Sequence, residues 1–200
     1  MTWAACDPGA SQNAAAVVGL AVSPGGIWAP VYLWEQSGTR GHPLDLRRIL
    51  VPHARAVREL GAASWMTDAF ALHDATHAGW EGGIATVVEG GEMLERWRDL
   101  LAIIARSQLS LAPHPRLTRE QWPLLEVLGE QLATVREVSR GGRRTIEIPT
   151  VGASHGDLAS AFARAFHHAK AADYVLDDLP RPIPSADDGM QYADLTWYRG

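Results

Sequence analysis

Three aspartates stand where the sequence predicts that a secondary-structure element begins or ends. Asp7 and Asp68 each close a short apolar run, and Asp157 opens a helix. Carboxylates that converge on one place repel one another, so a fold keeps such a cluster chiefly when a divalent cation neutralises it. Oxygen ligands without cysteine or paired histidine favour Mg²⁺ or Mn²⁺ over zinc. The three aspartates are therefore candidate catalytic residues and metal ligands.

Each aspartate also has an ordinary structural interpretation. A strand often ends in Asp because its side chain initiates a turn, which fits Asp7 and Asp68. Asp157 follows Ser154 by three residues, which resembles a capping box, and a carboxylate in the first turn suits the helix dipole. Taken singly, each residue leaves both interpretations open.

The elements that must position these residues begin with a sheet. Alternation and turn signals predict three antiparallel strands, followed by a helix with Pro52 in its first turn and then a fourth strand. A loop with His73, His77 and Gly79 then leads to a fifth strand. The predicted ranges are 3–7, 14–22 and 26–35 for the first strands, 52–60 for the helix, and 63–67 and 84–88 for the later strands.

The second half of the chain is predicted to be mainly helical. Apolar spacing predicts helices over 92–106, 118–132 and 153–172, with an edge strand over 108–115. Gln121 stands at the capping-box position of the second of these helices. Two strands, 134–139 and 144–148, flank Arg140-Gly141-Gly142-Arg143, which is a hairpin signal.

This order of elements predicts a mixed α/β sheet in which the fourth strand lies parallel to the first. Parallel neighbours place their carboxyl ends side by side. We therefore expect Asp7 and Asp68 to meet at one edge of the sheet.

Length and composition suit one soluble domain. We expect residues 1–175 to form it, with residues 176–200 as an acidic, proline-rich tail. The net charge of −5 argues against wholesale coating of nucleic acid but allows a local basic strip, and the cations are 17 Arg against one Lys. The single Cys6 fits a reducing, cytoplasmic location. The sequence contains neither a membrane-span pattern nor a signal-peptide pattern.

Several short motifs together resemble one protein family. Asp7-Pro8-Gly9 opens the sheet, Asp68 ends the fourth strand, and His-Gly-Asp-Leu-Ala at 155–159 opens a helix. With the segments 109–113 and 145–149, they resemble the RNase H-like nuclease domain of phage large terminases. The resemblance covers roughly residues 1–172, and it depends on the order and spacing of the motifs.

This resemblance implies an RNase H-like mixed sheet flanked by helices, with an added β-hairpin. It also implies that Asp7, Asp68 and Asp157 bind two Mg²⁺ or Mn²⁺ ions and cut double-stranded DNA during viral genome packaging. Portal and small terminase proteins would then be partners, in the cytoplasm of a host cell. The chain departs from a full terminase because it contains no Gly-x-x-x-x-Gly-Lys-Ser/Thr loop of an ATPase motor.

Two further groups of residues have open interpretations. Arg140, Arg143 and Arg144 on the hairpin are either a solvated tip or a DNA-binding clamp for phosphates. His155 is a candidate auxiliary residue beside the metal or a phosphate. His73 and His77 have the spacing of zinc ligands, but the sequence supplies no evident third ligand.

Three other functions compete with the terminase nuclease. A Holliday-junction resolvase of the same fold shares Asp-Pro-Gly after the first strand, although that family usually has Glu on the fourth strand and lacks the hairpin segment at 140–144. An actin-like phosphotransferase fragment would bind a nucleotide through the same loop. A non-catalytic docking domain would retain the acids without activity.

Overall fold

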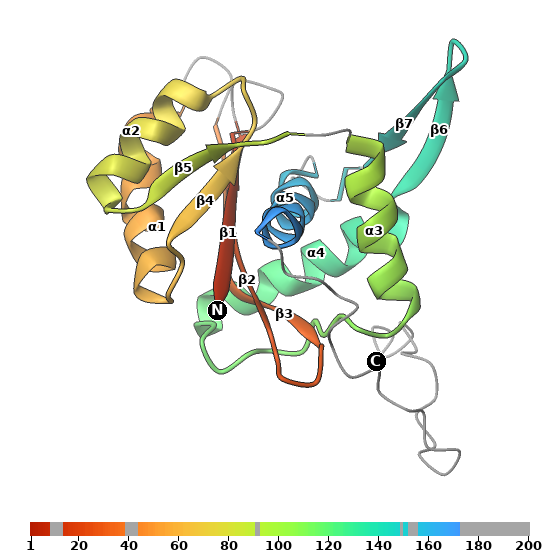
Figure 1. Cartoon of the computed structure of the whole chain (residues 1–200), viewed down its shortest axis with the longest axis horizontal. Coiled ribbons are helices and arrows are strands. Elements are labelled where there is room, and N and C mark those ends of the chain that lie inside the picture. Colours follow the sequence, from red (N-terminus) through yellow and green to blue (C-terminus); the bar gives the residue numbers. More distant parts are fainter. Residues whose placement is uncertain (9–13, 39–43, 91–92, 149, 152–155, 173–200) are drawn as a thin grey trace.

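The computed structural model describes residues 1–8, 14–38, 44–90, 93–148, 150–151 and 156–172. Strands form a central sheet with helices on both of its faces, so the predicted mixed α/β class is confirmed (Figure 1). The elements in chain order are β1 (Thr2–Asp7), β2 (Ala14–Val22), β3 (Trp28–Ser37), α1 (Leu46–Glu59), β4 (Ser64–Thr67), α2 (Leu72–Gly82), β5 (Ala85–Val88), α3 (Met93–Ala105), a 3₁₀ turn (Arg119–Gln121), α4 (Trp122–Thr134), β6 (Arg136–Arg140), β7 (Arg143–Glu147) and α5 (Asp157–Ala171).

The topology of the sheet brings three strand ends to one edge. Among the described residues, five strands pair in the order β3-β2-β1-β4-β5. Strands β1, β2 and β3 are antiparallel neighbours, whereas β4 is parallel to β1 and β5 is parallel to β4. The predicted meander and the parallel fourth strand are thus confirmed. Because parallel strands end at the same edge, the residues that follow β1, β4 and β5 are neighbours.

Strand β1 is buried on both faces and divides the apolar core into two clusters within the described residues. Successive side chains of a strand point to opposite faces. Trp3 and Ala5 belong to the cluster that includes side chains from α3, α4 and α5, whereas Ala4 and Cys6 belong to the cluster with α1 and α2. A β1 residue therefore has helices packed over whichever face it points to.

Helix α5 packs against β1 and β2 and is almost entirely buried (Figure 1). Phe162 and Phe166 are fully buried, and the Phe166 ring meets Trp28 edge-on with ring centroids 5.0 Å apart. Each buried phenylalanine contributes about 1.5–3 kcal/mol by the removal of apolar surface from water. Near the end of the helix, His168 Nδ1 donates to Ala4 O at 3.0 Å, and Nε2 lies 3.0 Å from Ser64 Oγ. These contacts fix which face of α5 points at the sheet.

The predicted loop after Asp68 is wrong, because most of this segment forms α2. Its glycines lie where other elements pack closely against the helix. The packing requires a small residue at these positions, so the glycines do not end the helix. A Cβ on Gly79 would lie 2.5 Å from Thr86 Oγ1, and a Cβ on Gly82 would lie 2.5 Å from Ala54 Cβ. The helix ends only at Gly83, which has a positive φ of 72°.

Helix α1 starts at Leu46, so Pro52 lies in its second turn and not in the first turn, where the sequence predicts it. Asp45 is the N-cap, and its side chain accepts a hydrogen bond from the Arg48 N–H at 3.3 Å. Pro52 lies inside the helix on its exposed side. The capping aspartate, not the proline, therefore sets the start of this helix.

The predicted edge strand over 108–115 is also wrong. The segment forms a single bridge at Leu109, where the Trp28 N–H donates to Gln108 O and the Ser110 N–H donates to Trp28 O, both at 2.8 Å. The ladder stops there, and Pro113 just beyond cannot donate to it because proline lacks an N–H.

The remaining helices and the hairpin occur where the sequence predicts them. The capping box before α4 is present, with the Thr118 N–H donating to Gln121 Oε1 at 2.9 Å. Strands β6 and β7 pair antiparallel through a turn at Gly141-Gly142 and project away from the central sheet (Figure 1).

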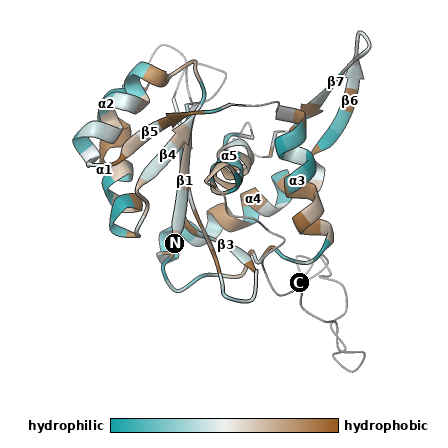
Figure 2. Cartoon of the chain, viewed as in Figure 1, coloured by the Kyte–Doolittle hydropathy of each residue, from teal (hydrophilic) through white to brown (hydrophobic). Residues whose placement is uncertain are grey.

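Strand β5 is an outer strand of the central sheet, paired on one side only among the described residues. It is hydrophobic along much of its length (Figure 2), and its Val87 and Val88 are partly exposed.

The boundary at residue 175 and the tail 176–200 stay predictions, because residues 173–200 lie outside the described ones. None of the described helices has the length and hydropathy that crossing a membrane requires.

Candidate active site

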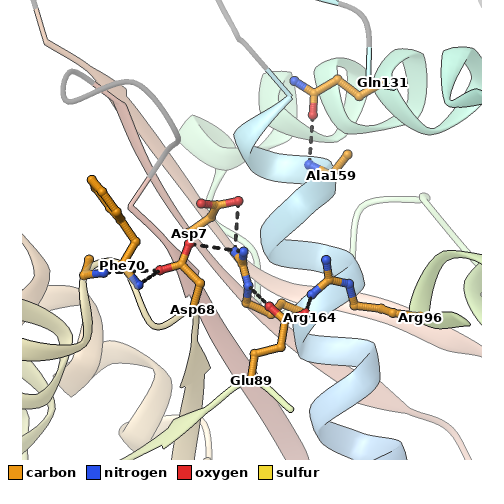
Figure 3. A network of polar contacts seen from close by, with 9 residues as sticks. Asp7, Asp68, Phe70, Glu89, Arg96, Gln131, Ala159 and Arg164 are labelled. Atoms are coloured by element: carbon orange, nitrogen blue, oxygen red, sulfur yellow. Dashed lines mark hydrogen bonds and ion pairs between the residues drawn. The ribbon is translucent and has the colours of Figure 1, made fainter. Parts of the chain in front are cut away.

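Asp7 and Asp68 close two neighbouring parallel strands, and both carboxylates point at the same cation (Figure 3). Asp7 is the last residue of β1 and is buried, whereas the Asp68 side chain is about one-third exposed at 30%. The guanidinium of Arg164, from the middle of α5, lies 2.9 Å from Asp7 Oδ2 through Nη1 and 3.4 Å from Asp68 Oδ2 through Nη2. The structure therefore brings together two of the three predicted aspartates.

Asp68 serves as a turn former and as a member of this cluster at once. Its Oδ1 accepts hydrogen bonds from the backbone N–H groups of Phe70 at 3.1 Å and Ala71 at 3.3 Å (Figure 3). Its other oxygen faces Arg164. The ordinary interpretation of Asp68 and the functional one are therefore compatible, because each uses a different oxygen.

Glu89 is a third carboxylate at the same edge, directly after β5. Its backbone N–H donates to Thr67 O at 2.7 Å, which extends the β4–β5 pairing by one residue. Its Oε2 accepts from Arg164 Nε at 2.7 Å, and its Oε1 forms an ion pair with Arg96 Nη1. Glu89 thus joins two buried guanidinium groups, one from α3 and one from α5.

Arg96 and Arg164 are buried, at 2% and 5% exposure, which is rare for arginine unless it is paired. Burial and, to a smaller extent, the positive charge of Arg164 together lower the pKa of Arg96 to about 10, although Asp7 and Asp68 act in the opposite direction. The side chain nevertheless stays protonated at neutral pH. Two cations accordingly balance most of the charge of Asp7, Asp68 and Glu89.

The sequence interpretation missed Glu89, Arg96 and Arg164. A signal for Glu89 was available, because it follows its strand as Asp68 follows β4. Arg164 interrupts a helix otherwise rich in alanine and phenylalanine, seven residues or two turns after Asp157. An arginine within so apolar a helix indicates a buried ionic partner.

Asp157 is the first residue of α5 and is buried. The capping-box interpretation is wrong, because the N-cap is Gly156, with φ of 93°, and the third helical residue is Ala159. The Ala159 N–H donates to Oε1 of the buried Gln131 of α4 at 2.9 Å (Figure 3). A neighbouring helix therefore supplies the cap. The carboxylate of Asp157 remains suited to the helix dipole, and it lies on the same face of α5 as Arg164.

The carboxylates of this edge fit a hard divalent cation by their chemistry. They are oxygen donors, and the guanidinium of Arg164 shows that a positive charge is accommodated between Asp7 and Asp68. Across the part of the chain that the structure describes, however, no group of three or more His, Cys, Asp or Glu side chains is arranged to hold a metal ion. The positive charge at this edge comes from Arg164 and Arg96.

The remaining candidates lie elsewhere or outside the described residues. His155 is outside them. His77 Nε2 lies 3.2 Å from Glu81 within α2, an ordinary helical pair.

At the hairpin, Arg140 pairs in register with Arg143, and the exposed Arg144 lies 3.1 Å from Glu137 Oε1.

Solved structures match this chain, whereas no family model and no curated protein does. The large terminase nuclease of thermophilic phage G20c has a TM-score of 0.59 at 16% identity and covers 84% of this chain and 81% of its own. The HK97 bacteriophage large terminase has a TM-score of 0.59 at 13% identity; 82% of this chain matches 38% of that longer one. The g2p large-terminase nuclease domain of bacteriophage SPP1, solved with bound Mn, has a TM-score of 0.51 at 13% identity, covering 83% and 85%.

At identities of 13% to 16%, these likenesses concern the arrangement of elements. The arrangement is a mixed sheet, antiparallel and then parallel, with helices on both faces. The chain therefore has the RNase H-like fold found in the nuclease domains of phage large terminases.

Proposed function

We propose that this protein is a metal-dependent endonuclease that hydrolyses phosphodiester bonds of double-stranded DNA. The observation that carries the proposal is the meeting of Asp7 and Asp68 at the ends of adjacent parallel strands, on one guanidinium. In open α/β sheets, the carboxyl ends of parallel strands are where ligands bind. The fold shared with nuclease domains supports the same conclusion.

The proposed ligands of the metal are Asp7, Asp68 and Asp157. Carboxylate oxygens favour Mg²⁺ or Mn²⁺, and the SPP1 nuclease domain was solved with bound Mn. When bound, two such ions would supply a nucleophile from water at neutral pH and neutralise the charge on the leaving 3′-oxygen. Asp68 is the carboxylate that a metal ion from solution reaches more easily, because its side chain is 30% exposed whereas that of Asp7 is 7% exposed.

The chain's own groups have separable tasks in this proposal. Asp7 is held rigidly by β1 and by Arg164, so its carboxylate keeps one orientation. The turn hydrogen bonds from Phe70 and Ala71 orient Asp68. We assign DNA contacts to Arg140, Arg143 and Arg144, because a projecting hairpin with arginines at its end can reach phosphates without reading sequence. We propose His155 as an auxiliary residue.

The biological role that we propose is cutting of viral DNA for genome packaging, with portal and small terminase proteins as partners. Its support is the likeness to the terminase structures. The chain matches only 38% of the HK97 large terminase, so the activities of that whole protein stay proposals here.

The test is an assay with supercoiled plasmid in Mn²⁺, Mg²⁺ or EDTA. We expect nicked and linear products with either ion and none with EDTA. Asp7→Asn should abolish cleavage, whereas Asp74→Asn, which changes a partly exposed acid of α2, should leave it unchanged. Intact plasmid at high protein concentration and millimolar Mn²⁺ would contradict the proposal.

Three further measurements separate the competing functions. A four-way junction offered together with linear duplex identifies a resolvase if only the junction is cut, in paired symmetric incisions. Binding of ATP without DNA cleavage would support the phosphotransferase alternative. A folded protein that does neither, but binds a packaging component, would be the docking domain.

A further inference from the structure

The buried guanidinium of Arg164 lies between the carboxylates that the proposed function assigns to a metal. We infer that Arg164 is a positioning residue that acts as the internal counter-ion of Asp7 and Asp68, and that a divalent cation competes with it for these carboxylates. The counter-ion role stands on the contacts of Arg164 with the three carboxylates. Only the competition rests on the proposed metal-dependent function.

Each nitrogen of the Arg164 guanidinium faces a different carboxylate (Figure 3). Nη1 lies 2.9 Å from Asp7, Nη2 lies 3.4 Å from Asp68, and Nε lies 2.7 Å from Glu89. Arginine suits this task because its planar group presents donors in fixed directions, which a lysine cannot do. One side chain thereby collects the acids that follow β1, β4 and β5.

Glu89 and Arg96 fix the orientation of this guanidinium. Glu89 accepts from Arg164 Nε with one oxygen and pairs with Arg96 through the other. Arg96 is 2% exposed and belongs to α3, so the support comes from a different helix. This arrangement orients the guanidinium of Arg164 toward Asp7 and Asp68.

The contact of Arg164 with Asp68 is the one that a cation would replace first. It is the longest of the three, at 3.4 Å, and the Asp68 side chain is the most exposed of the carboxylates involved, at 30% against 14% for Glu89 and 7% for Asp7. Asp68 Oδ1 is held by two backbone N–H groups, so Oδ2 is the oxygen that can change partner. A cation with a charge of +2 and the guanidinium repel each other, so their occupancy of this edge is coupled.

The counter-ion role is tested without metal by a cycle of variants. Arg164→Gln should lower the Tm by roughly 10 °C, because it leaves buried carboxylates without their partner. Adding Asp68→Asn to Arg164→Gln should then raise the Tm, whereas Asp68→Asn in the wild-type background should lower it or leave it unchanged. This reversal of sign is specific to charge compensation. Additive losses would mean that Arg164 only packs, and would overturn the inference.

A matched control is the exposed pair of Arg98 and Glu137, whose Nη2 and Oε1 lie 3.4 Å apart. The equivalent cycle of Arg98→Gln and Glu137→Gln should show small shifts without a reversal of sign. If Arg164→Gln alone fails to fold, recovery of a cooperative transition in Asp68→Asn/Arg164→Gln or Asp7→Asn/Arg164→Gln supports the inference. Failure of all of these variants to fold overturns it.

The competition is tested by titration calorimetry with MnCl₂ alone, without DNA. Removing the positive charge in Arg164→Gln should tighten Mn²⁺ binding at least about tenfold, and Arg164→Lys, which keeps a charge, should stay close to wild type. Unchanged or weaker binding by Arg164→Gln would overturn the competition. If no variant binds Mn²⁺, the competition and the metal dependence of the proposed function both fail. The metal-free cycle still decides the counter-ion role in that case.

Discussion

Arg164 Nη1 lies 2.9 Å from Asp7 Oδ2, in a position where both side chains are almost completely removed from water. This buried ion pair changes the conclusion that the cluster of aspartates supports. Repulsion among carboxylates predicts a divalent cation, but this protein already contains a cation that relieves most of that repulsion. Replacing one of these aspartates therefore also leaves the positive charge of Arg164 without one of its partners, and its effect is more than a relief of repulsion between carboxylates.

Asp7→Asn should destabilise the metal-free protein by about 3 kcal/mol, because it leaves the buried charge of Arg164 partly uncompensated. Urea denaturation in EDTA measures the change. Asp99→Asn is the matched control, because Asp99 pairs with Lys170 at the surface and its loss should cost at most about 1 kcal/mol. An Asp7→Asn variant as stable as wild type would contradict the assigned pairing.

Asp157→Asn separates a metal ligand from a helix-dipole residue. We expect cleavage of plasmid to fall at least about a hundredfold and the rise in Tm with Mn²⁺ to shrink, because ligand binding stabilises only through the folded site. Without metal, the loss of the charge at the helix terminus costs only about 0.3–1 kcal/mol. Melting curves with and without Mn²⁺, beside the plasmid assay, give the answer. A slightly less stable variant that still cuts DNA would remove Asp157 from the site.

The three arginines of the hairpin should contribute to DNA binding through phosphates. Replacing Arg140, Arg143 and Arg144 together with Ala should weaken binding equally across sequences. The slope of log K against log salt should fall by roughly 0.9 for each arginine that contacts a phosphate. Fluorescence anisotropy at several salt concentrations measures both effects. The control Arg47→Ala changes an exposed cation of α1, and a triple variant with the same slope as this control would make the hairpin a solvated tip.

Acid should destabilise the protein partly through His53. Its ring stacks on Trp34 with centroids 3.9 Å apart, and its Nδ1 lies 2.6 Å from Tyr32 Oη. Burial lowers the pKa of His53 to about 4. The unfolded chain, with an ordinary histidine pKa of about 6.5, binds the proton more readily, so stability is lost as the pH falls from about 6.5 towards 4.

His53→Gln should make this loss of stability with falling pH shallower. Urea unfolding at pH values between 8 and 4.5 measures the slope, and the comparison at pH 8, where the imidazole is neutral, gives the effect of the substitution alone. A variant with the same slope as wild type would mean that His53 does not contribute to the acid sensitivity. His168, whose pKa is also lowered by burial, acts in the same direction and should leave a residual slope.

The sequence by itself determined the sheet and the place of its first two acids. Periodicity of two, turn residues and strand order are local signals, and parallel pairing then requires Asp7 and Asp68 to end at one edge. Local signals failed where packing replaced them. Gly79 and Gly82 resemble loop formers in sequence, but they are small because two other elements approach α2 closely.

Only the tertiary structure decided which cation faces those acids and what caps α5. Arg164 is 157 residues from Asp7 in the chain and Gln131 comes from a different helix than Ala159, so no local pattern connects them. The rotation of α5 about its axis is fixed by apolar packing against β1 and β2, with His168 held by Ala4. That rotation places one buried guanidinium among the carboxylates, because the direction of a helical side chain depends on which face the core selects.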